Sequence, residues 1–263
     1  MKKVKTFQAE LSKRTKPGTF FTQLEEESIQ CFACAHQCTL KPGQYGICKL
    51  RFNHQGALMV PSGYVAGLQL DPIEKKPFNH FLPGALTLSF GMVGCNFQCS
   101  FCQNWLSAQA LNDPSSRFSE QYLHEIEPKE IVQSAKKNRA KAIVSTYNEP
   151  LITSEWAIEI FSLAHQAGIK TAFVSNGFGT PEGLEKLAPY LDAMKIDLKS
   201  FSEDTYKDLG GHLKPVLNTI TTAIELGIWV EVVTLLVPEM NDSPPELWDL
   251  TRFLPGTDRN IPW

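Results

Sequence analysis

The seven cysteines of this sequence fall into two separate groups. The first, near the N-terminus, has the spacing C-x2-C-x3-C-x9-C and consists of Cys31, Cys34, Cys38 and Cys48. The second has the spacing C-x3-C-x2-C and consists of Cys95, Cys99 and Cys102. Oxidative cross-linking would not require this segregation, whereas two sets of ligands would produce it. We therefore expect metal, cluster or redox chemistry at both groups rather than disulfides.

The second group places three thiolates on one short loop, close enough to ligate three irons of a [4Fe-4S] cube. The fourth iron would have no protein ligand from this loop and could bind a substrate or cofactor directly. A structural zinc site is the alternative, but zinc takes four ligands and no nearby histidine supplies one. The spacing therefore favours an iron–sulfur cluster with one open iron.

The first group leaves more alternatives. Four cysteines suit tetrahedral zinc, a second iron–sulfur cluster or a redox pair, and His36 adds another donor. Unligated thiols in a small loop-rich region are the remaining interpretation. We expect a metal at Cys31, Cys34, Cys38 and Cys48, but the spacing does not select zinc over iron.

A regular alternation of strands and helices follows Pro83-Gly84. Apolar runs predict strands at 85–91, 141–147, 170–175, 193–197 and 228–237. Helical patterns lie between them and after them, at 130–139, 155–167, 181–188, 217–226 and 245–253. This order predicts right-handed crossovers and a parallel sheet, with one site built from the loops at the carboxyl ends of the strands. Five strands do not close an eight-stranded barrel.

Composition and charge narrow the class of protein. The net charge of -3 gives no electrostatic case for a nucleic-acid partner. The chain shows neither a secretory signal nor an apolar stretch long enough for a bilayer, so we expect a cytoplasmic protein without a membrane partner. We divide it into a polar, loosely held extension (1–28), a cysteine-rich segment (29–84) and an α/β core (85–263).

The three-cysteine loop resembles that of the radical SAM enzymes, whose motif is C-x3-C-x-aromatic-C, with Phe101 in the aromatic place. The resemblance implies a [4Fe-4S] cluster whose open iron binds S-adenosylmethionine (SAM). It also implies reductive cleavage of SAM to a 5′-deoxyadenosyl radical that abstracts hydrogen from a substrate. An external electron donor such as flavodoxin or ferredoxin would supply the electron.

Loops after three of the expected strands extend the resemblance. Thr146-Tyr-Asn-Glu-Pro150 is similar to the family's loop for the methionyl amino group, which implies SAM contacts for Asn148 and Glu149. Asn176 and the pair Asp197 and Lys199 resemble positions in pyruvate formate-lyase activating enzymes, where the pair would bracket the zwitterionic methionine. Without the cysteine loop, these residues would be ordinary turns or a surface ion pair.

The chain most resembles the activating-enzyme-like branch called AmmeMemoRadiSam system radical SAM proteins. Pro72-Ile-Glu-Lys-Lys-Pro77, His80-Phe-Leu-Pro-Gly84 and Cys102-Gln-Asn104 carry this resemblance. The resemblance implies a partial parallel (β/α) barrel, and it does not identify a substrate. Related sequences continue beyond the end of this sequence into a sixth strand, so we expect the chain to be truncated. By itself, the charged stretch Glu74-Lys75-Lys76 is expected to be a solvated turn.

Two other functions compete with a radical SAM enzyme of unidentified substrate. The chain could be a glycyl-radical-enzyme activase that acts on a protein partner. From a different class, it could be a non-catalytic iron–sulfur or zinc-binding redox module. A module of this kind would bind metal without binding SAM.

Overall fold

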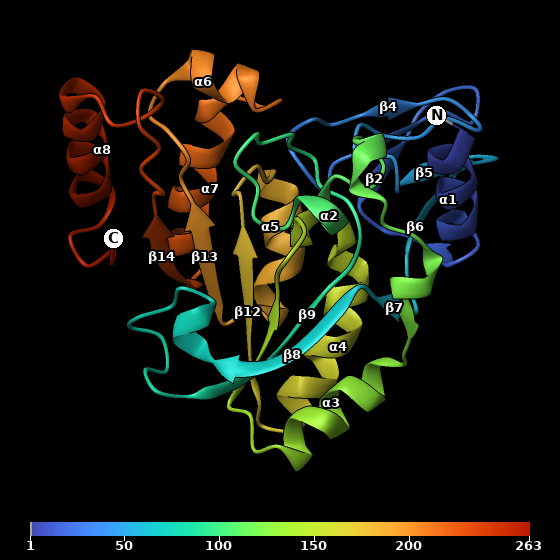
Figure 1. Cartoon of the computed structure of the whole chain (residues 1–263), viewed down its shortest axis with the longest axis horizontal. Coiled ribbons are helices and arrows are strands. Elements are labelled where there is room, and N and C mark those ends of the chain that lie inside the picture. Colours follow the sequence, from blue (N-terminus) through green and yellow to red (C-terminus); the bar gives the residue numbers. More distant parts are fainter. Residues whose placement is uncertain (1) are drawn as a thin grey trace.

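A six-stranded sheet organises the chain, which a computed structural model describes from residue 2 to residue 263. Its strand order is β14-β13-β12-β11-β9-β8. Five strands are parallel: β9 (Leu86–Gly91), β11 (Ala142–Ser145), β12 (Lys170–Ser175), β13 (Ala193–Asp197) and β14 (Trp229–Val233). The arrowheads of β12, β13 and β14 point toward the end of the molecule where α6 and the N-terminal segment lie (Figure 1).

The predicted parallel strands are confirmed, with one difference in topology. A sixth strand, β8 (Gly67–Pro72), pairs antiparallel with β9 and extends the sheet at the far edge from β14. The sheet is therefore mixed, although its other pairings are parallel as predicted. The prediction of 228–237 as one strand was too long, because β14 ends at Val233 and the chain then leaves the sheet.

Helices cover one face of this sheet. They are α3 (Pro128–Lys137), α4 (Ser154–Gln166), α5 (Pro181–Leu187) and α7 (Leu213–Glu225). Local signals set their ends: Thr180 accepts a hydrogen bond from the backbone N–H of Gly183 at the start of α5, and Gly168 follows α4 at a φ of +71°. The shorter helices α2 (Trp105–Ala108) and α6 (Glu203–Asp208) lie near the carboxyl ends of the strands.

The segment between β8 and β9 covers part of the opposite face of the sheet. Phe78 and Ile73 from this segment are fully buried against Ala142, Ala172 and Ala193. Small side chains on three neighbouring strands leave room for these larger ones, so this end of the partial barrel is filled. The open end is therefore the carboxyl end of the strands.

The N-terminal part forms small antiparallel sheets and one helix. Their elements are α1 (Lys2–Ser12), β1 (Thr15–Pro17), β2 (Phe21–Gln23), β3 (Ile29–Cys31), β4 (Thr39–Leu40), β5 (Phe52–His54), β6 (Ala57–Pro61), β7 (Tyr64–Val65) and β10 (His124–Glu125). The expectation that 1–28 is loosely held was wrong for residues 2–28. Phe7, Leu11 and Phe20 are buried in the main core, and β1 pairs with β6.

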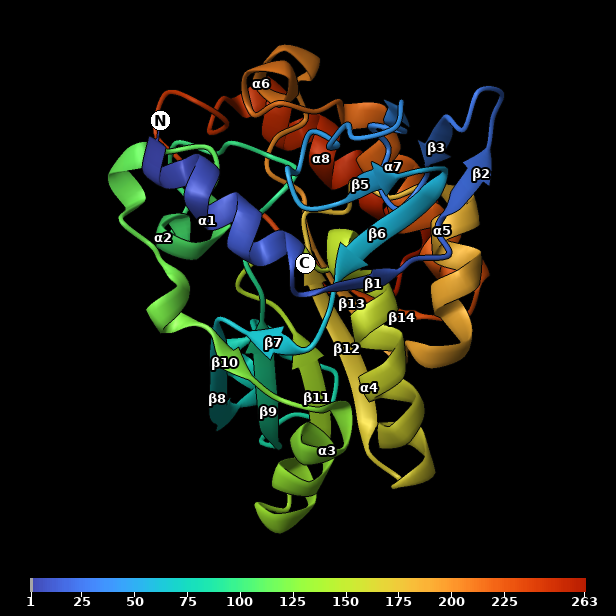
Figure 2. The ribbon, with the colours of Figure 1, turned by 90° about the vertical axis from the view of Figure 1, so that its right-hand side faces the viewer.

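The last helix, α8 (Pro244–Thr257), stands beside the β14 edge of the sheet (Figure 1). The residues that follow return to this edge, where the backbone N–H of Val232 donates to the carbonyl of Pro262 at 2.9 Å. Figure 1 shows α8 and the N-terminal elements on opposite sides of the molecule, and Figure 2 shows the ribbon from the side of α1 and β6. Within residues 2–263, no helix has an apolar stretch of the length needed to cross a membrane.

Candidate functional site

The three-cysteine loop begins where β9 ends, at the open end of the sheet. Cys95, Cys99 and Cys102 are free and partly buried. The backbone N–H of Phe97 donates to the sulfur of Cys95 at 3.4 Å, and the fully buried Phe97 ring anchors the loop in the core. The loop is thus held in place while its thiols stay at the edge of the core.

The charges around these thiols come from other strands. Burial raises the pKa of the Cys99 thiol to about 11, and the nearby ammonium of Lys199 opposes that rise. Lys199 acts in the same direction on the pKa values of Cys95 and Cys102, which burial also raises. One cation therefore lies near all three thiols and favours their thiolate forms, which are the forms that bind metal.

Lys199 itself is held by groups from several elements. Its ammonium pairs with the carboxylate of Asp197 and lies 5.6 Å from the centroid of the Phe101 ring. Although burial disfavours the charged form, Asp197 raises the pKa of Lys199 above its usual value. The Asp197 side chain remains 32% exposed. A positive and a negative group therefore stand side by side next to the cysteine loop.

Glu149 follows β11 and is almost fully buried. Its Oε1 accepts hydrogen bonds from the backbone N–H of Leu151 at 3.0 Å and from the Ser175 hydroxyl at 2.7 Å. Its Oε2 accepts from the backbone N–H of Asn176 at 2.8 Å. Burial raises the pKa of Glu149 to about 7, against the effect of these donors. The carboxylate joins the loop after β11 to the loop after β12.

The two predicted asparagines also connect neighbouring loops. Asn148 accepts a hydrogen bond from the backbone N–H of Met92 at 2.9 Å, which ties the end of β9 to the end of β11. Asn176 donates from Nδ2 to Oδ1 of Asn96 at 2.8 Å, within the cysteine loop. The structure thus brings together all five predicted SAM-contact residues (Asn148, Glu149, Asn176, Asp197 and Lys199) at the end of the sheet that carries the cysteine loop.

The first cysteine group forms a separate cluster. Cys31, Cys34, Cys38 and Cys48 line one small cavity, together with His36 and Arg51. No three His, Cys, Asp or Glu side chains in residues 2–263 are already arranged to hold a metal ion. This also applies to the cysteine loop after β9. The three thiols there, with one cation beside them, are a donor set that fits such a cluster.

Comparisons with known proteins agree with this arrangement. Residues 90–251 match the model of the Radical SAM superfamily, which is more than half of the chain. The chain belongs to the radical SAM superfamily. The matched region contains the cysteine loop and all five predicted SAM-contact residues.

The relatives of the chain include activating enzymes and a protein named as uncharacterized. An uncharacterized protein of Methanocaldococcus jannaschii, MJ0808, is 36% identical over 236 residues, which cover 89% of this chain and 68% of that protein. The pyruvate formate-lyase-activating enzyme of Clostridium pasteurianum is 25% identical over 190 residues, or 68% of this chain and 73% of that enzyme. A solved structure of TYW1 with a lysine-pyruvate adduct bound can be superposed over 74% of this chain and 72% of that one. The sequence identity is 17% and the TM-score is 0.49.

Family membership decides between the broad classes of function. The chain is an enzyme of the radical SAM class, and its relatives include activating enzymes. The alternative of a non-catalytic redox module is therefore disfavoured. The fold agrees with this assignment, because a mostly parallel sheet carries the cysteine loop at the carboxyl ends of its strands.

Two groups near the site were not predicted from the sequence. Asn96, within the cysteine loop, is buried, although in sequence it is an ordinary loop residue. Lys76, expected to be solvated, is only 5% exposed, and its ammonium donates to the Tyr147 hydroxyl at 2.8 Å. Tyr147 has a φ of +71°, which is unusual for a bulky residue. The neighbouring Lys75 is exposed, as expected.

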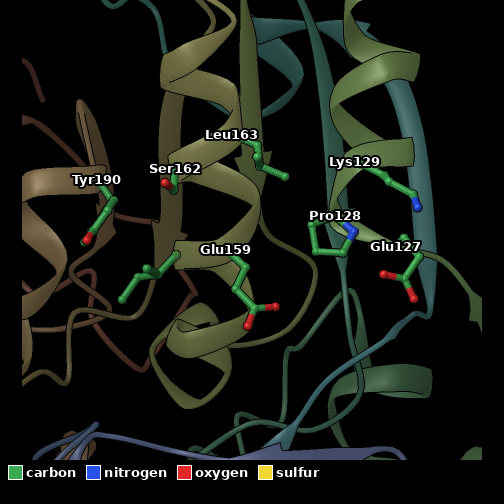
Figure 3. A pocket seen from close by; sticks show the side chains of 8 residues that line it. Glu127, Pro128, Lys129, Glu159, Ser162, Leu163 and Tyr190 are labelled. Carbon is green, nitrogen blue, oxygen red and sulfur yellow. The ribbon is translucent and has the colours of Figure 1, made fainter.

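A surface pocket lies far from these groups on the helical layer. It has a volume of about 510 Å³ and runs between α3 and α4. Its lining residues are Glu127, Pro128, Lys129, Ile158, Glu159, Ser162, Leu163 and Tyr190 (Figure 3). None of these belongs to the predicted site, so this pocket is not part of the radical SAM centre.

Proposed function

We propose that this radical SAM enzyme holds a [4Fe-4S] cluster on Cys95, Cys99 and Cys102. When bound, the cluster and SAM supply reductive cleavage to methionine and a 5′-deoxyadenosyl radical, which abstracts hydrogen from a substrate. The loop would contribute three thiolates and leave one iron without a protein ligand, open to SAM. The chain's own residues hold the thiolates, orient SAM and keep water away from the centre.

The ion pair of Lys199 and Asp197 beside the three thiols is the observation that carries this proposal. The methionyl group of SAM has an ammonium and a carboxylate. The ion pair offers a negative charge for the ammonium and a positive charge for the carboxylate. Asp197 accepts hydrogen bonds from the ammonium, while Lys199 donates to the carboxylate. Both charges are available at the thiols, because Lys199 lies near all three sulfurs and Asp197 is partly exposed.

Asn148, Glu149 and Asn176 shape the same site from the adjoining loops. Glu149 already accepts three hydrogen bonds from within the chain, so its main effect is to fix the loops that surround SAM. Its buried negative charge also lies near Cys95 and Lys199. Further contacts of these three residues with SAM, including acceptance of the ammonium by Glu149, remain predictions.

The reaction needs one electron from outside the chain. Flavodoxin or ferredoxin is the class of donor that we propose. The seven cysteines are all free, and an exposed cluster edge is sensitive to oxygen, so we expect the protein to act in a reducing compartment such as the cytoplasm.

A glycyl-radical-enzyme activase acting on a protein partner is the second candidate. Relatives named as pyruvate formate-lyase and choline trimethylamine-lyase activating enzymes favour it. Trp105 and Leu106, directly after the cysteine loop, are 39% and 50% exposed and offer an apolar surface to a protein. A glycyl radical signal on a partner that is co-incubated with the reduced enzyme would support this function.

The proposed cluster can be tested spectroscopically. The anaerobically reconstituted protein should contain about four irons per chain at the cysteine loop, and its reduced form should give a low-temperature paramagnetic resonance signal. Addition of SAM should shift this signal, because SAM binds the open iron. A signal that SAM leaves unchanged would show that the cluster does not bind SAM.

A further inference from the structure

The first cysteine group forms a second candidate site, remote in sequence from the cysteine loop. We propose that Cys31, Cys34, Cys38 and Cys48 bind one zinc ion. This goes beyond the proposed function, since zinc at this place takes no part in the cleavage of SAM. The argument rests on the convergence of the thiols, the hydrogen-bond donor that faces one of them, and the size of the space between them.

The four thiols face one another although they come from different turns. Cys31, Cys34 and Cys48 are buried, and Cys38 is partly buried. All four are free, and all four line the same cavity. Four mutually close thiolates would repel one another, so a bound cation is what would stabilise them together.

A hydrogen-bond donor points at one of these sulfurs. Cys31 receives a hydrogen bond at 3.3 Å from Nε of the buried Arg51 side chain. Such donors orient thiolates and stabilise their charge, as groups around metal-bound sulfur do.

The side chain of Asn96 provides an independent sign that a negatively charged thiolate belongs at this cluster. This side chain is 2% exposed and lies near Cys34. In the described chain its Nδ2 has no hydrogen-bond partner of normal geometry. A buried N–H without a partner is costly, but a zinc-bound thiolate at Cys34 would accept from it.

The space between the sulfurs selects a single ion. The cavity has a volume of about 10 Å³. This is roughly the space for one water-sized sphere, and a cube of four irons and four sulfides would not fit without opening the loops. Zinc takes four thiolates in a closed tetrahedral site. Because the thiols are not yet at ligand positions, they must turn inward around the ion.

Metal analysis of the full-length protein tests this proposal without any assay of SAM cleavage. Anaerobically purified wild type and the variant Cys95→Ala/Cys99→Ala/Cys102→Ala should each contain about one zinc per chain. The variant Cys31→Ser/Cys34→Ser should lose the zinc and keep the iron of the cysteine loop. Wild type without zinc, or about four irons bound by the first group, would overturn the proposal.

X-ray absorption at the zinc edge gives a second measurement on wild type, which does not depend on whether a variant folds. The expected result is a shell of about four sulfur ligands at about 2.3 Å. A shell dominated by nitrogen or oxygen would instead mean that the zinc is bound elsewhere and would contradict the proposal. Because the cluster-loop variant lacks the catalytic cysteines, a failure of the proposed function leaves both zinc measurements unaffected.

Discussion

The ammonium of Lys199 lies 5.6 Å from the centre of the Phe101 ring, so the charged residue after β13 contacts the aromatic residue of the cysteine loop. The loop after β9 and the loop after β13 are separated by β11 and β12 in the sheet. Their contact is therefore made above the strand ends, where the proposed cofactors would bind. Lys199 therefore connects the loop after β13 to the cysteine loop, as Asn176 connects the loop after β12 to it through Asn96.

Replacement of this lysine should weaken SAM binding. Lys199→Met removes a charge-assisted hydrogen bond to the SAM carboxylate, worth about 1.5 to 3 kcal/mol, so we expect roughly a 10- to 100-fold rise in Kd. Equilibrium dialysis with the reconstituted protein measures this change. Lys207→Met is the matched control, because Lys207 is exposed and its ammonium pairs with nearby Asp204. Equal affinities of the two variants would remove Lys199 from the SAM site.

Glu149 is expected to matter for stability as well as for SAM. Glu149→Gln places an amide where the carboxylate accepts from the backbone N–H of Asn176 and from Ser175. At least one buried donor then loses its partner, which should cost about 1 to 3 kcal/mol of unfolding free energy. Urea denaturation of the apoprotein measures it. The exposed Glu185→Gln should change stability by less than about 0.5 kcal/mol, and a similar small change for Glu149 would contradict its bridging role.

Gly91, at the end of β9, is expected to be irreplaceable. A Cβ at this position would overlap the carbonyl oxygen of Thr146, and the backbone there cannot move aside as a side chain would. Gly91→Ala should therefore displace the start of the cysteine loop and lower both stability and iron content. In Gly256→Ala, the new methyl group meets no atom within 4 Å and sits in a helix, so it should be neutral or slightly stabilising. Normal iron content in Gly91→Ala would show that a Cβ at this position does not displace the cysteine loop.

The buried ion pair of Arg51 and Glu155 connects the cysteine-rich segment to α4. The guanidinium makes two hydrogen bonds to the carboxylate, at 2.7 and 2.8 Å. Glu155→Gln leaves the Arg51 charge buried without its partner, so we expect a loss of about 3 to 5 kcal/mol in unfolding free energy. Chemical denaturation at neutral pH measures this loss, and a change below about 1 kcal/mol would show that the pair contributes little.

The same pair predicts how stability depends on pH. Burial acts to raise the pKa of Glu155, but Arg51 more than offsets it and lowers the pKa below its usual value. A lowered folded-state pKa gives stability that is present above the unfolded pKa of about 4.3 and lost as the pH falls through the folded value. The stability difference between wild type and Glu155→Gln should therefore shrink below about pH 4. A difference that grows on acidification would contradict this.

Much of the fold could be predicted because the core strands are short apolar runs with clear ends. The bounds of β12 and β13 agree with the sequence prediction residue for residue. The edge strand β8 was missed because its leucines alternate with other residues and are themselves partly exposed, so it has no continuous apolar run. The helix α1 was missed because its composition is polar, although Phe7 and Leu11 bury one face of it.

The site was predictable in residue type but not in its internal contacts. The cysteine spacing and the polar residues after the strands predicted one centre at an edge of the sheet, and the structure brings these residues together there. The hydrogen bond between Asn96 and Asn176 joins residues 80 positions apart, and no local pattern predicts such a pair. Likewise, the burial of Lys76 depends on its contact with Tyr147, which lies on a different loop.

The central claim is that the cysteine loop supports reductive cleavage of SAM, and product analysis tests it most directly. The reconstituted protein is reduced anaerobically and incubated with SAM, and 5′-deoxyadenosine is quantified by chromatography. We predict that wild type forms 5′-deoxyadenosine and that Cys99→Ala, which removes one of the three cluster ligands, forms none above background. Equal formation by Cys99→Ala and wild type would contradict the assignment of the cluster to this loop.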